Sequence, residues 1–217
     1  MNSLADIFSD MFSISPVHAN HGTEPPSYKF PTVHPLDSEP VNIIQPNNIQ
    51  GPWIAGGACL RWIQNQPVGD SDLDVFCSCK EQAQKVIEQV KSYGRYSNKF
   101  TSDNATTLDY YSHNNTMQWT IQIITKRYYT DPQEIINNFD VSVCQIATDG
   151  ERFLLGKDTA KDIRERNLRM RMPLQPDAVK RLTKYWTYGY RPVEGLIEAV
   201  QNNPDARWEY QVDEDYR

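Results

Sequence analysis

The segment WIAGGACLRWIQNQPVGDSDLDVF, residues 53–76, constrains the fold more than any other part of this chain. Two adjacent glycines, Gly56 and Gly57, follow a short apolar run, and an Asp-Leu-Asp triplet comes fifteen residues after them. Glycines permit a tight turn and a close approach of the backbone to another group. The order of apolar run, glycine turn, helical pattern and second apolar run predicts a strand, a helix and a second strand.

The triplet predicts a metal site. On a strand, Asp72 and Asp74 project to one side, whereas Leu73 and Val75 between and after them point into the core. Two carboxylates this close repel one another unless a divalent cation lies between them. Mg²⁺ is held in proteins by one or two carboxylates, with water and phosphate oxygens in its other positions. We therefore expect Asp72 and Asp74 to bind Mg²⁺ or Mn²⁺ and to be the catalytic residues.

The glycine turn predicts a phosphate site beside that metal. Gly56 and Gly57 allow close backbone approach, and the start of the following helix offers free N–H groups to an anion. A glycine pair alone is often only a loop, and an Asp-x-Asp alone is often a solvated strand edge. Their combination in this order predicts a site for a metal-bound polyphosphate.

Periodicity along the remaining chain predicts the fold class. We expect α/β (α+β) architecture: a mixed sheet flanked by helices, with a small helical part at the C-terminus. Asp131 and Pro132 have the residue types of an N-cap and a first helical position. The expected strands are 53–55, 73–77, 107–111, 118–125 and 140–147, and the expected helices are 58–64, 81–92, one beginning at Asp131-Pro132, and the segment after Gly150.

Composition divides the chain into three segments. Residues 1–48 are expected to be an extended or poorly ordered arm, because residues 1–50 hold seven of the fourteen prolines and only one lysine. Residues 49–150 are expected to form the catalytic domain. Residues 151–217 are expected to be helical, with an acidic tail.

The cysteines and the hydropathy indicate a cytoplasmic protein. Four cysteines with irregular spacing do not form a disulfide framework, so we expect reduced core residues. No stretch approaches the length of a transmembrane helix, and the N-terminus lacks a secretory signal pattern. We therefore expect no membrane partner.

Charge is unevenly spread in this chain of net charge −6. Residues 160–191 carry nine Lys and Arg against three Asp and Glu, which indicates an anion-binding surface. Within this window Lys180, Arg181 and Lys184 are expected to share one helical face. They would contact a triphosphate or a nucleic-acid acceptor, and a merely solvated helix surface is the alternative.

Four segments together resemble the DNA polymerase β nucleotidyltransferase superfamily, and most closely the head domain of CCA-adding enzymes and bacterial poly(A) polymerases. The first is GGACLRWIQNQPVGDSDLDVF, which is similar to the family's glycine pair and Asp-x-Asp strand. The others, in the family's order, are NNFDVSVCQIATDG at 137–150, LLGKDTAKDIRERNLRM at 154–170 and DAVKRLTKYWTYGYRP at 177–192.

The resemblance implies further site residues. It places Asp140 at a motif aspartate, which would contact the nucleotide sugar or support the strand of the metal ligands. It places Arg61 one position later than the family's arginine after the glycines. Where many members carry a third carboxylate on a neighbouring strand, this chain has Gln122. The site would then work with two carboxylates, as in the branch that resembles CCA-adding enzymes.

The function implied is metal-dependent transfer of a nucleotide from an NTP to an acceptor hydroxyl. An RNA or tRNA end, a protein hydroxyl and a small molecule remain open as acceptors, and so does the oligomeric state. The alternative is a catalytically silent nucleotidyltransferase-like protein that binds a nucleotide or a macromolecular partner, which Gln122 favours.

Overall fold

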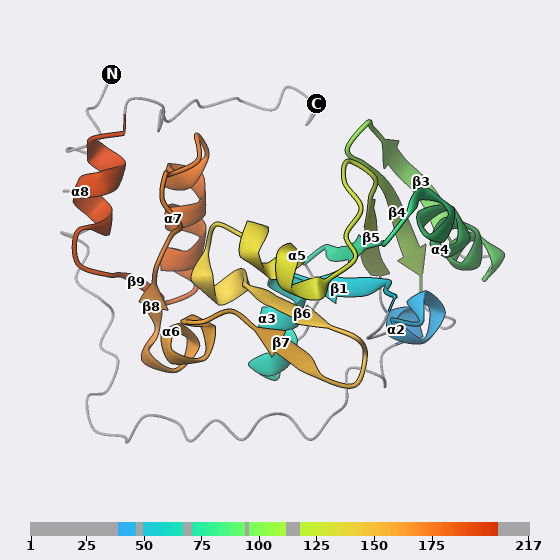
Figure 1. Ribbon diagram of the computed structural model, residues 1–217, viewed down its shortest axis with the longest axis horizontal. Coiled ribbons are helices and arrows are strands. Elements are labelled where there is room, and N and C mark those ends of the chain that lie inside the picture. Colours follow the sequence, from blue (N-terminus) through green and yellow to red (C-terminus); the bar gives the residue numbers. More distant parts are fainter. Residues whose placement is uncertain (1–38, 47–49, 67–70, 94–95, 112–117, 204–217) are drawn as a thin grey trace.

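A computed structural model of the chain describes residues 39–46, 50–66, 71–93, 96–111 and 118–203. These residues form a seven-stranded mixed sheet with helices around it and a smaller helical part beyond it (Figure 1). The elements before the last sheet strand are α2 (Glu39–Ile44), β1 (Trp53–Ala55), α3 (Gly57–Ile63), β2 (Leu73–Phe76), α4 (Lys80–Ser92), β3 (Tyr96–Thr101), β4 (Ala105–Tyr111), β5 (Gln118–Ile124), α5 (Pro132–Asn138), the 3-10 helix η2 (Ser142–Cys144) and β6 (Ile146–Thr148). They are followed by β7 (Phe153–Leu155), α6 (Thr159–Glu165), β8 (Asn167–Leu168), α7 (Ala178–Thr187), β9 (Arg191–Pro192) and α8 (Leu196–Gln201).

The sheet has the strand order β3-β4-β5-β2-β1-β6-β7. Strands β2 and β5 are parallel, and every other neighbouring pair in this sheet is antiparallel. The expected fold class is therefore confirmed. A parallel pair requires a long crossover, and here the chain between β2 and β5 contains α4, β3 and β4.

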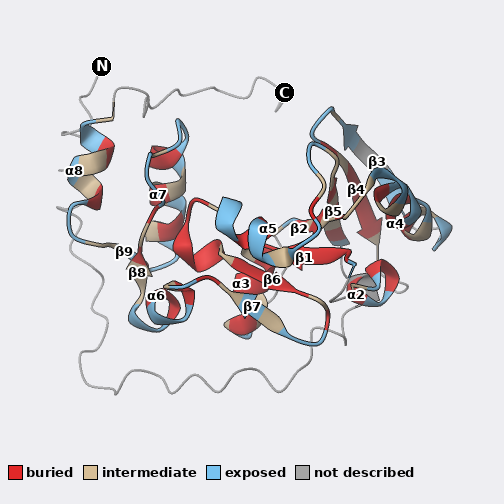
Figure 2. Cartoon of the chain, viewed as in Figure 1, coloured by how far each residue is buried: buried red, intermediate tan, exposed pale blue. Residues whose placement is uncertain are grey.

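Helix α4 shows why these residues form these elements. Ala83, Val86, Ile87 and Val90 recur at helical spacing and are all buried. Burial alternates along β2: Leu73 and Val75 are fully buried, and the residues that alternate with them are partly exposed. Figure 2 shows this as red along the central strands and blue on the outer sides of the helices.

The expectation for the N-terminal arm is corrected in part. Residues 39–44 form α2, and Val41, Ile43 and Ile44 are at most 1% exposed in the main core. The apolar side chains of EPVNII are sufficient to anchor one short helix, which the proline-rich context obscured. Residues 1–38 and 47–49 of that expected arm, and the acidic tail from 204 onward, lie outside the described residues.

Two other expectations differ from the structure. In place of the expected strand 140–147, the chain forms a single β-bridge at Val141, then η2, and then the shorter strand β6. The chain turns at η2, where α6 packs against it. The sheet also continues past Gly150, since β7 pairs with β6. The sheet is therefore not confined to the expected segment 49–150. Within the described ranges, no helix is both long and apolar enough to cross a bilayer.

Candidate active site

The glycine turn lies directly beside the second aspartate of the triplet. Gly56 has a φ of 86° and its N–H donates to the carbonyl of Ile146 on β6. A Cβ at this position would lie 2.9 Å from the ring of Phe139 and 3.4 Å from Oδ2 of Asp74. Only glycine therefore fits both the backbone conformation and the space. A Cβ at Gly57, the first residue of α3, would meet nothing within 4 Å.

The two aspartates lie at the start of β2. Asp72 is exposed just before the strand, and Asp74 is half-buried within it. On one side Asp74 pairs with Ala55 of β1, and on the other with Gln122 of β5. Strand β2 thus brings Asp74 beside the glycine turn, and Asp72 lies immediately before the strand.

The pKa of Asp74 reflects its burial and the charges around it. Burial, together with the charge of Asp72, raises the pKa of Asp74 from 3.8 to about 7. Lys184 and Arg181 of α7 act on the pKa of Asp74 in the opposite direction, so both cationic side chains lie near the carboxylate. Two repelling carboxylates are the oxygen donors that Mg²⁺ and Mn²⁺ accept in proteins, and these residues therefore fit a divalent cation.

Among the described residues, no third carboxylate joins this pair as a metal ligand. Gln122 occupies the position next to Asp74 in the parallel register, and its Nε2 lies 3.5 Å from Oγ1 of Thr107 on β4. Asp109 on β4 pairs with Thr120 of β5, and its Oδ1 accepts a hydrogen bond of 2.8 Å from that residue. In the described part of the chain, no three His, Cys, Asp or Glu side chains are grouped as metal ligands.

A small cationic pocket opens beside Gly57. It has a volume of about 160 Å³, and Arg61, Ser71, Lys184 and Tyr188 line it together with Gly57. Arg61 donates from Nε to Oγ of Ser71 at 3.0 Å, and its guanidinium lies 5.2 Å from the ring centroid of Tyr188. The pocket combines fixed donors with open space, which suits the terminal phosphates of a nucleotide.

A larger pocket opens nearer the start of α7. Its volume is about 620 Å³, and its lining includes Phe76, Asp140, Asp177 and Arg181. Arg181 donates from Nη1 to Oδ1 of Asp140 at 2.8 Å and from Nε to Oδ2 of Asp177 at 2.7 Å. Burial raises the pKa of Asp140, and its Oδ2 is buried with no hydrogen-bond partner. An unpartnered buried acceptor beside a pocket can receive a ligand's N–H or O–H.

The structure thus assembles most of the expected site residues. Gly56, Gly57, Asp72 and Asp74 lie together, with Arg61 beside Gly57. Arg181 reaches Asp140, and Lys184 lines the small pocket. Lys180 is exposed on α7, and it lines neither of these two pockets.

Ser71, Asp177 and Arg171 were not singled out from the sequence. Ser71 holds Arg61, Asp177 holds Arg181, and Arg171 lines the larger pocket. The i,i+4 spacing of Asp177 and Arg181 is the one sequence signal that could have identified a pair. Nothing local indicates the contact of Arg61 with Ser71, because it depends on how α3 packs beside the start of β2.

Comparison with solved structures supports the fold. The chain is similar to the Bacillus stearothermophilus CCA-adding enzyme in complex with CTP, with a TM-score of 0.51, 15% identity, and coverage of 77% of this chain and 44% of that one. It is also similar to the Thermotoga maritima CCA-adding enzyme complexed with tRNA, with a TM-score of 0.48, 13% identity, and coverage of 68% and 36%. The chain therefore spans less than half the length of either enzyme.

The first of these likenesses shows a nucleotidyltransferase-like fold. The chain matches none of the curated proteins at a significant level. One family model does match: that of the Gabija anti-defense 2 family, over residues 37–166, which is more than half of the chain. This range includes the glycine turn, both aspartates and Asp140. The chain belongs to the Gabija anti-defense 2 family.

Proposed function

We propose that this protein is a metal-dependent nucleotidyltransferase that transfers a nucleoside monophosphate from an NTP to an acceptor hydroxyl. The observation that carries the proposal is the position of Asp72 and Asp74 between a glycine turn and the cationic face of α7. In such a reaction the bond from the α-phosphorus to the bridging oxygen breaks, and pyrophosphate leaves. The acceptor oxygen forms the new bond. Positioning and charge neutralisation provide most of the acceleration.

Asp72 and Asp74 would hold Mg²⁺ or Mn²⁺. When bound, the ion supplies charge neutralisation at the α-phosphate and lowers the pKa of the attacking hydroxyl. The chain's own residues position the substrate around it. Gly56 would make the turn and Gly57 would leave room for the triphosphate, and Arg61 and Lys184 would bind its terminal phosphates in the small pocket.

The larger pocket would receive the nucleoside. Arg181 lines this pocket and acts on Asp74, so the pocket adjoins the proposed metal site. Asp140 offers its free Oδ2 to a hydroxyl or amino group of the ligand, while Arg181 holds the other oxygen in place. The solved relative bound to CTP supports a nucleotide as ligand, and the one bound to tRNA suggests RNA as an acceptor to test.

The family description indicates the setting of the activity. It gives its members an anti-defense role against Gabija, and we propose that nucleotidyl transfer is how this chain serves that role. The acceptor would then be found in a lysate that contains Gabija. The sequence alone had also left a tRNA end, another protein and a small molecule open.

Labelling decides between an active and a silent enzyme. We would incubate the protein with each α-³²P-NTP, Mg²⁺ and lysates with or without Gabija, and compare Asp72→Asn and Asp74→Asn with the surface control Asp131→Asn. We expect a labelled species with the parent chain and the control but not with either site variant. The absence of transfer with all four nucleotides in both lysates would contradict the proposal.

The second candidate is a catalytically silent nucleotide-binding protein, which Gln122 in place of a third carboxylate favours. It predicts that an NTP raises the melting temperature in a Mg²⁺-dependent way while nothing becomes labelled. The same purified samples serve both measurements.

A further inference from the structure

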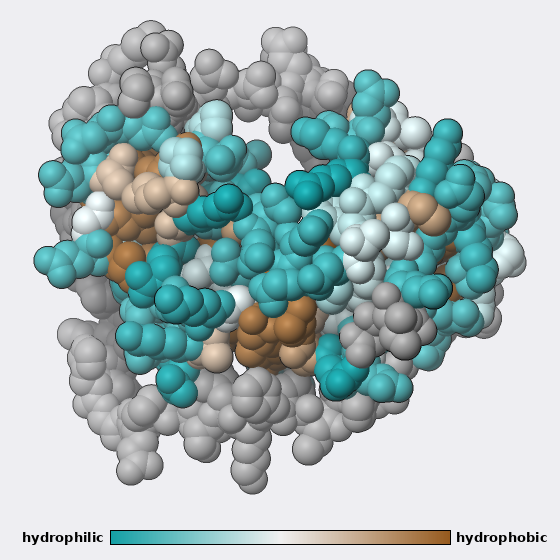
Figure 3. Space-filling view, in the orientation of Figure 1, coloured by the Kyte–Doolittle hydropathy of each residue, from teal (hydrophilic) through white to brown (hydrophobic). Residues whose placement is uncertain are grey.

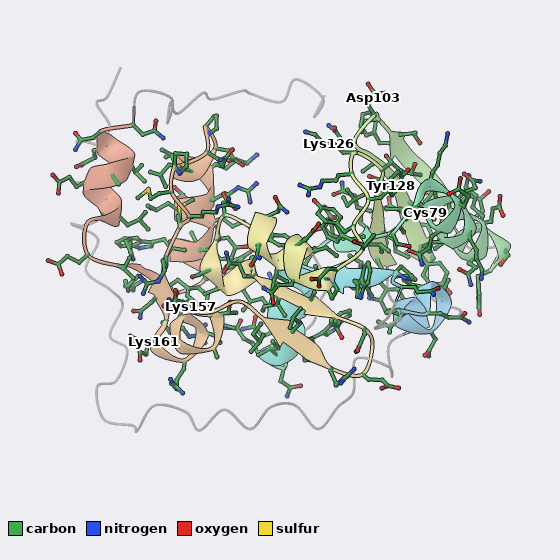
Figure 4. The ribbon with its side chains drawn as sticks, in the orientation of Figure 1. Cys79, Asp103, Lys126, Tyr128, Lys157 and Lys161 are labelled. Atoms are coloured by element: carbon green, nitrogen blue, oxygen red, sulfur yellow. The ribbon has the colours of Figure 1, made fainter. Side chains whose placement is uncertain are left out.

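A second group of positive charges lies outside the two pockets, on α6 and around the β8–β9 pair. We define this basic ridge as Lys157, Lys161, Arg164, Arg166 and Arg191, from the turn before α6 to strand β9. Four of the five are exposed, and Arg166 is half-buried. Figure 4 shows Lys157 and Lys161 together at the outer side of α6. Among the described residues, none of the five forms an ion pair within 4.0 Å.

Of the acids at α6, Asp162 is buried, whereas Asp158 and Glu165 lie at the surface, and the five cations of the ridge outnumber these two. Asp162 is fully buried and accepts hydrogen bonds of 2.7 Å from Ser142 and 3.2 Å from Arg169. Asp158 lies 4.0 Å from Arg169, and Glu165 accepts from Asn167 at 3.0 Å. The buried bonds of Asp162 fix α6 on η2, and so hold its basic side outward on a rigid support.

The folded chain also brings two distant arginines together. The N–H of Arg191 on β9 donates to the carbonyl of Arg166 at 2.7 Å, which places Arg191 beside the residue that ends α6 and precedes β8. Their guanidinium groups lie over aromatic rings: Arg166 is 5.4 Å from the ring centroid of Tyr190, and Arg191 is 5.2 Å from that of Trp186. Stacking fixes each charge without neutralising it.

Positive charges grouped in this way repel one another, and a bound anion removes this unfavourable electrostatic energy. A single phosphate would need only two or three of these groups. The ridge instead extends beyond one helical turn and across a strand pair, which fits a polymer with repeated charges. The protein as a whole is acidic, with a net charge of −6, so it does not attract polyanions over its entire surface. The guanidinium groups held over aromatic rings therefore indicate one specific anion-binding surface.

The ridge is separate from the nucleotide site. At about 100° per residue, Trp186 lies roughly 140° around α7 from Arg181 and 200° from Lys184. The ring beneath Arg191 therefore belongs to the side of α7 opposite to the two cationic residues that act on Asp74.

We propose that the basic ridge binds the phosphodiester backbone of a nucleic acid. The contact is to the backbone and is independent of nucleotidyl transfer, so it holds whether or not Asp72 and Asp74 catalyse a reaction. A nucleic acid held here would meet the protein at a distance from the metal site. The basic ridge therefore adds binding affinity for the nucleic acid but does not recognise the end of it that would react.

The test compares two triple variants of equal charge change. The ridge variant carries Lys157→Glu, Lys161→Glu and Arg164→Glu. The control carries Lys80→Glu, Lys85→Glu and Lys126→Glu, three exposed lysines on α4 and after β5. Fluorescence anisotropy of labelled 20-nucleotide RNA and DNA, single-stranded and duplex, is measured from low to moderate salt, with circular dichroism to establish folding.

We expect the ridge variant to bind at least tenfold more weakly than the control, and the dependence of log K on log salt to lose about two units of slope for single strands. The preferred probe identifies RNA or DNA as the source of the backbone. Asp74→Asn should bind the probes like the parent chain, which separates this proposal from the proposed activity. Equal nucleic-acid binding by the two triple variants would overturn the proposal. It would also be overturned if the parent chain bound no nucleic acid and the ridge variant instead lost binding to phosphatidylserine vesicles.

Discussion

Gly56 has the most restrictive backbone position in the site. Its φ of 86° lies in the region that side chains other than glycine rarely adopt, and an added Cβ would press on Phe139 at 2.9 Å. Gly57 next to it has open space. The two glycines of one motif thus have different roles: one makes the turn, and the other leaves the entrance to α3 free.

We expect Gly56→Ala to lower the free energy of unfolding by about 1–3 kcal/mol, because strain and a steric clash add together. Gly57→Ala should change it by less than about 1 kcal/mol, since alanine suits a helix. Urea unfolding of the two variants gives both values. Equal effects would show that the turn tolerates a side chain.

The raised pKa of Asp74 gives a pH prediction. Between the unfolded value near 3.8 and the folded value of about 7, the native state holds a proton that the unfolded state has lost. Without metal, the stability contributed by this group is therefore full below pH 4 and decreases as pH rises through 7. Asp74→Asn removes that decrease. In EDTA, the melting temperature of Asp74→Asn relative to that of the parent chain should therefore increase from pH 5 to pH 8.

Adding Mg²⁺ provides the matching control for the pH series. The ion competes with the proton for the same carboxylates, so its stabilising effect on the parent chain should grow from pH 6 to pH 8 and be absent in Asp74→Asn. A parallel pH dependence of the two proteins in EDTA would contradict the assignment of the shift to Asp74.

At the scale of elements, α7 is held to the sheet domain by polar contacts beneath its cationic face. Arg181 reaches Asp140 across 41 positions in sequence, and the hydroxyl of Tyr185 lies 2.5 Å from Sγ of Cys144 over the same separation. Arg181 lines the larger pocket and Lys184 lines the smaller one. The docking of this one helix therefore positions residues for both ends of a nucleotide.

We expect Arg181→Met to cost about 2 kcal/mol of unfolding free energy, because it leaves the buried carboxylate of Asp140 with no cationic partner. The double variant with Asp140→Asn should recover part of that loss, since no uncompensated charge remains. Chemical denaturation of the two single variants and the double variant completes the cycle. Additive losses would mean that the two side chains do not stabilise one another.

At the scale of the whole molecule, the described chain is a sheet whose two ends carry different surfaces. Figure 3 shows hydrophilic residues over most of one face and a hydrophobic patch over β7, where Leu154 is 36% exposed. Helix α2 lies at the α4 end of the sheet, while α6, α7 and α8 lie together at the other (Figure 1). The family model begins at residue 37, just before α2, which agrees with α2 being part of the folded unit.

Two truncations test the role of α2. A chain that begins at residue 38 keeps the helix, and one that begins at residue 49 loses it. We expect the shorter chain to melt at a clearly lower temperature, because removing Val41, Ile43 and Ile44 opens the core that α4 also covers. Calorimetry on the pair isolates the helix. Identical melting would place α2 outside the cooperative unit.

The sequence by itself determined the local parts of this protein. The glycine turn, the strand of the two aspartates, the apolar face of α4 and the Asp131 cap of α5 all follow from interactions between residues close in sequence, and the structure contains each of them. The fold class followed as well, because the order of these elements allows few arrangements.

Only the tertiary structure decided which distant residues meet. The parallel register sets Gln122 beside Asp74, the docking of α7 sets Arg181 against Asp140, and the pairing of β8 with β9 joins Arg166 to Arg191. Neighbours in sequence cannot specify these contacts. They depend on strand order and on the burial of whole elements, whose free energies are shared among many residues. The sequence did not predict α2 for the same reason. Six residues in a proline-rich segment form a helix only where their apolar side chains pack into a core.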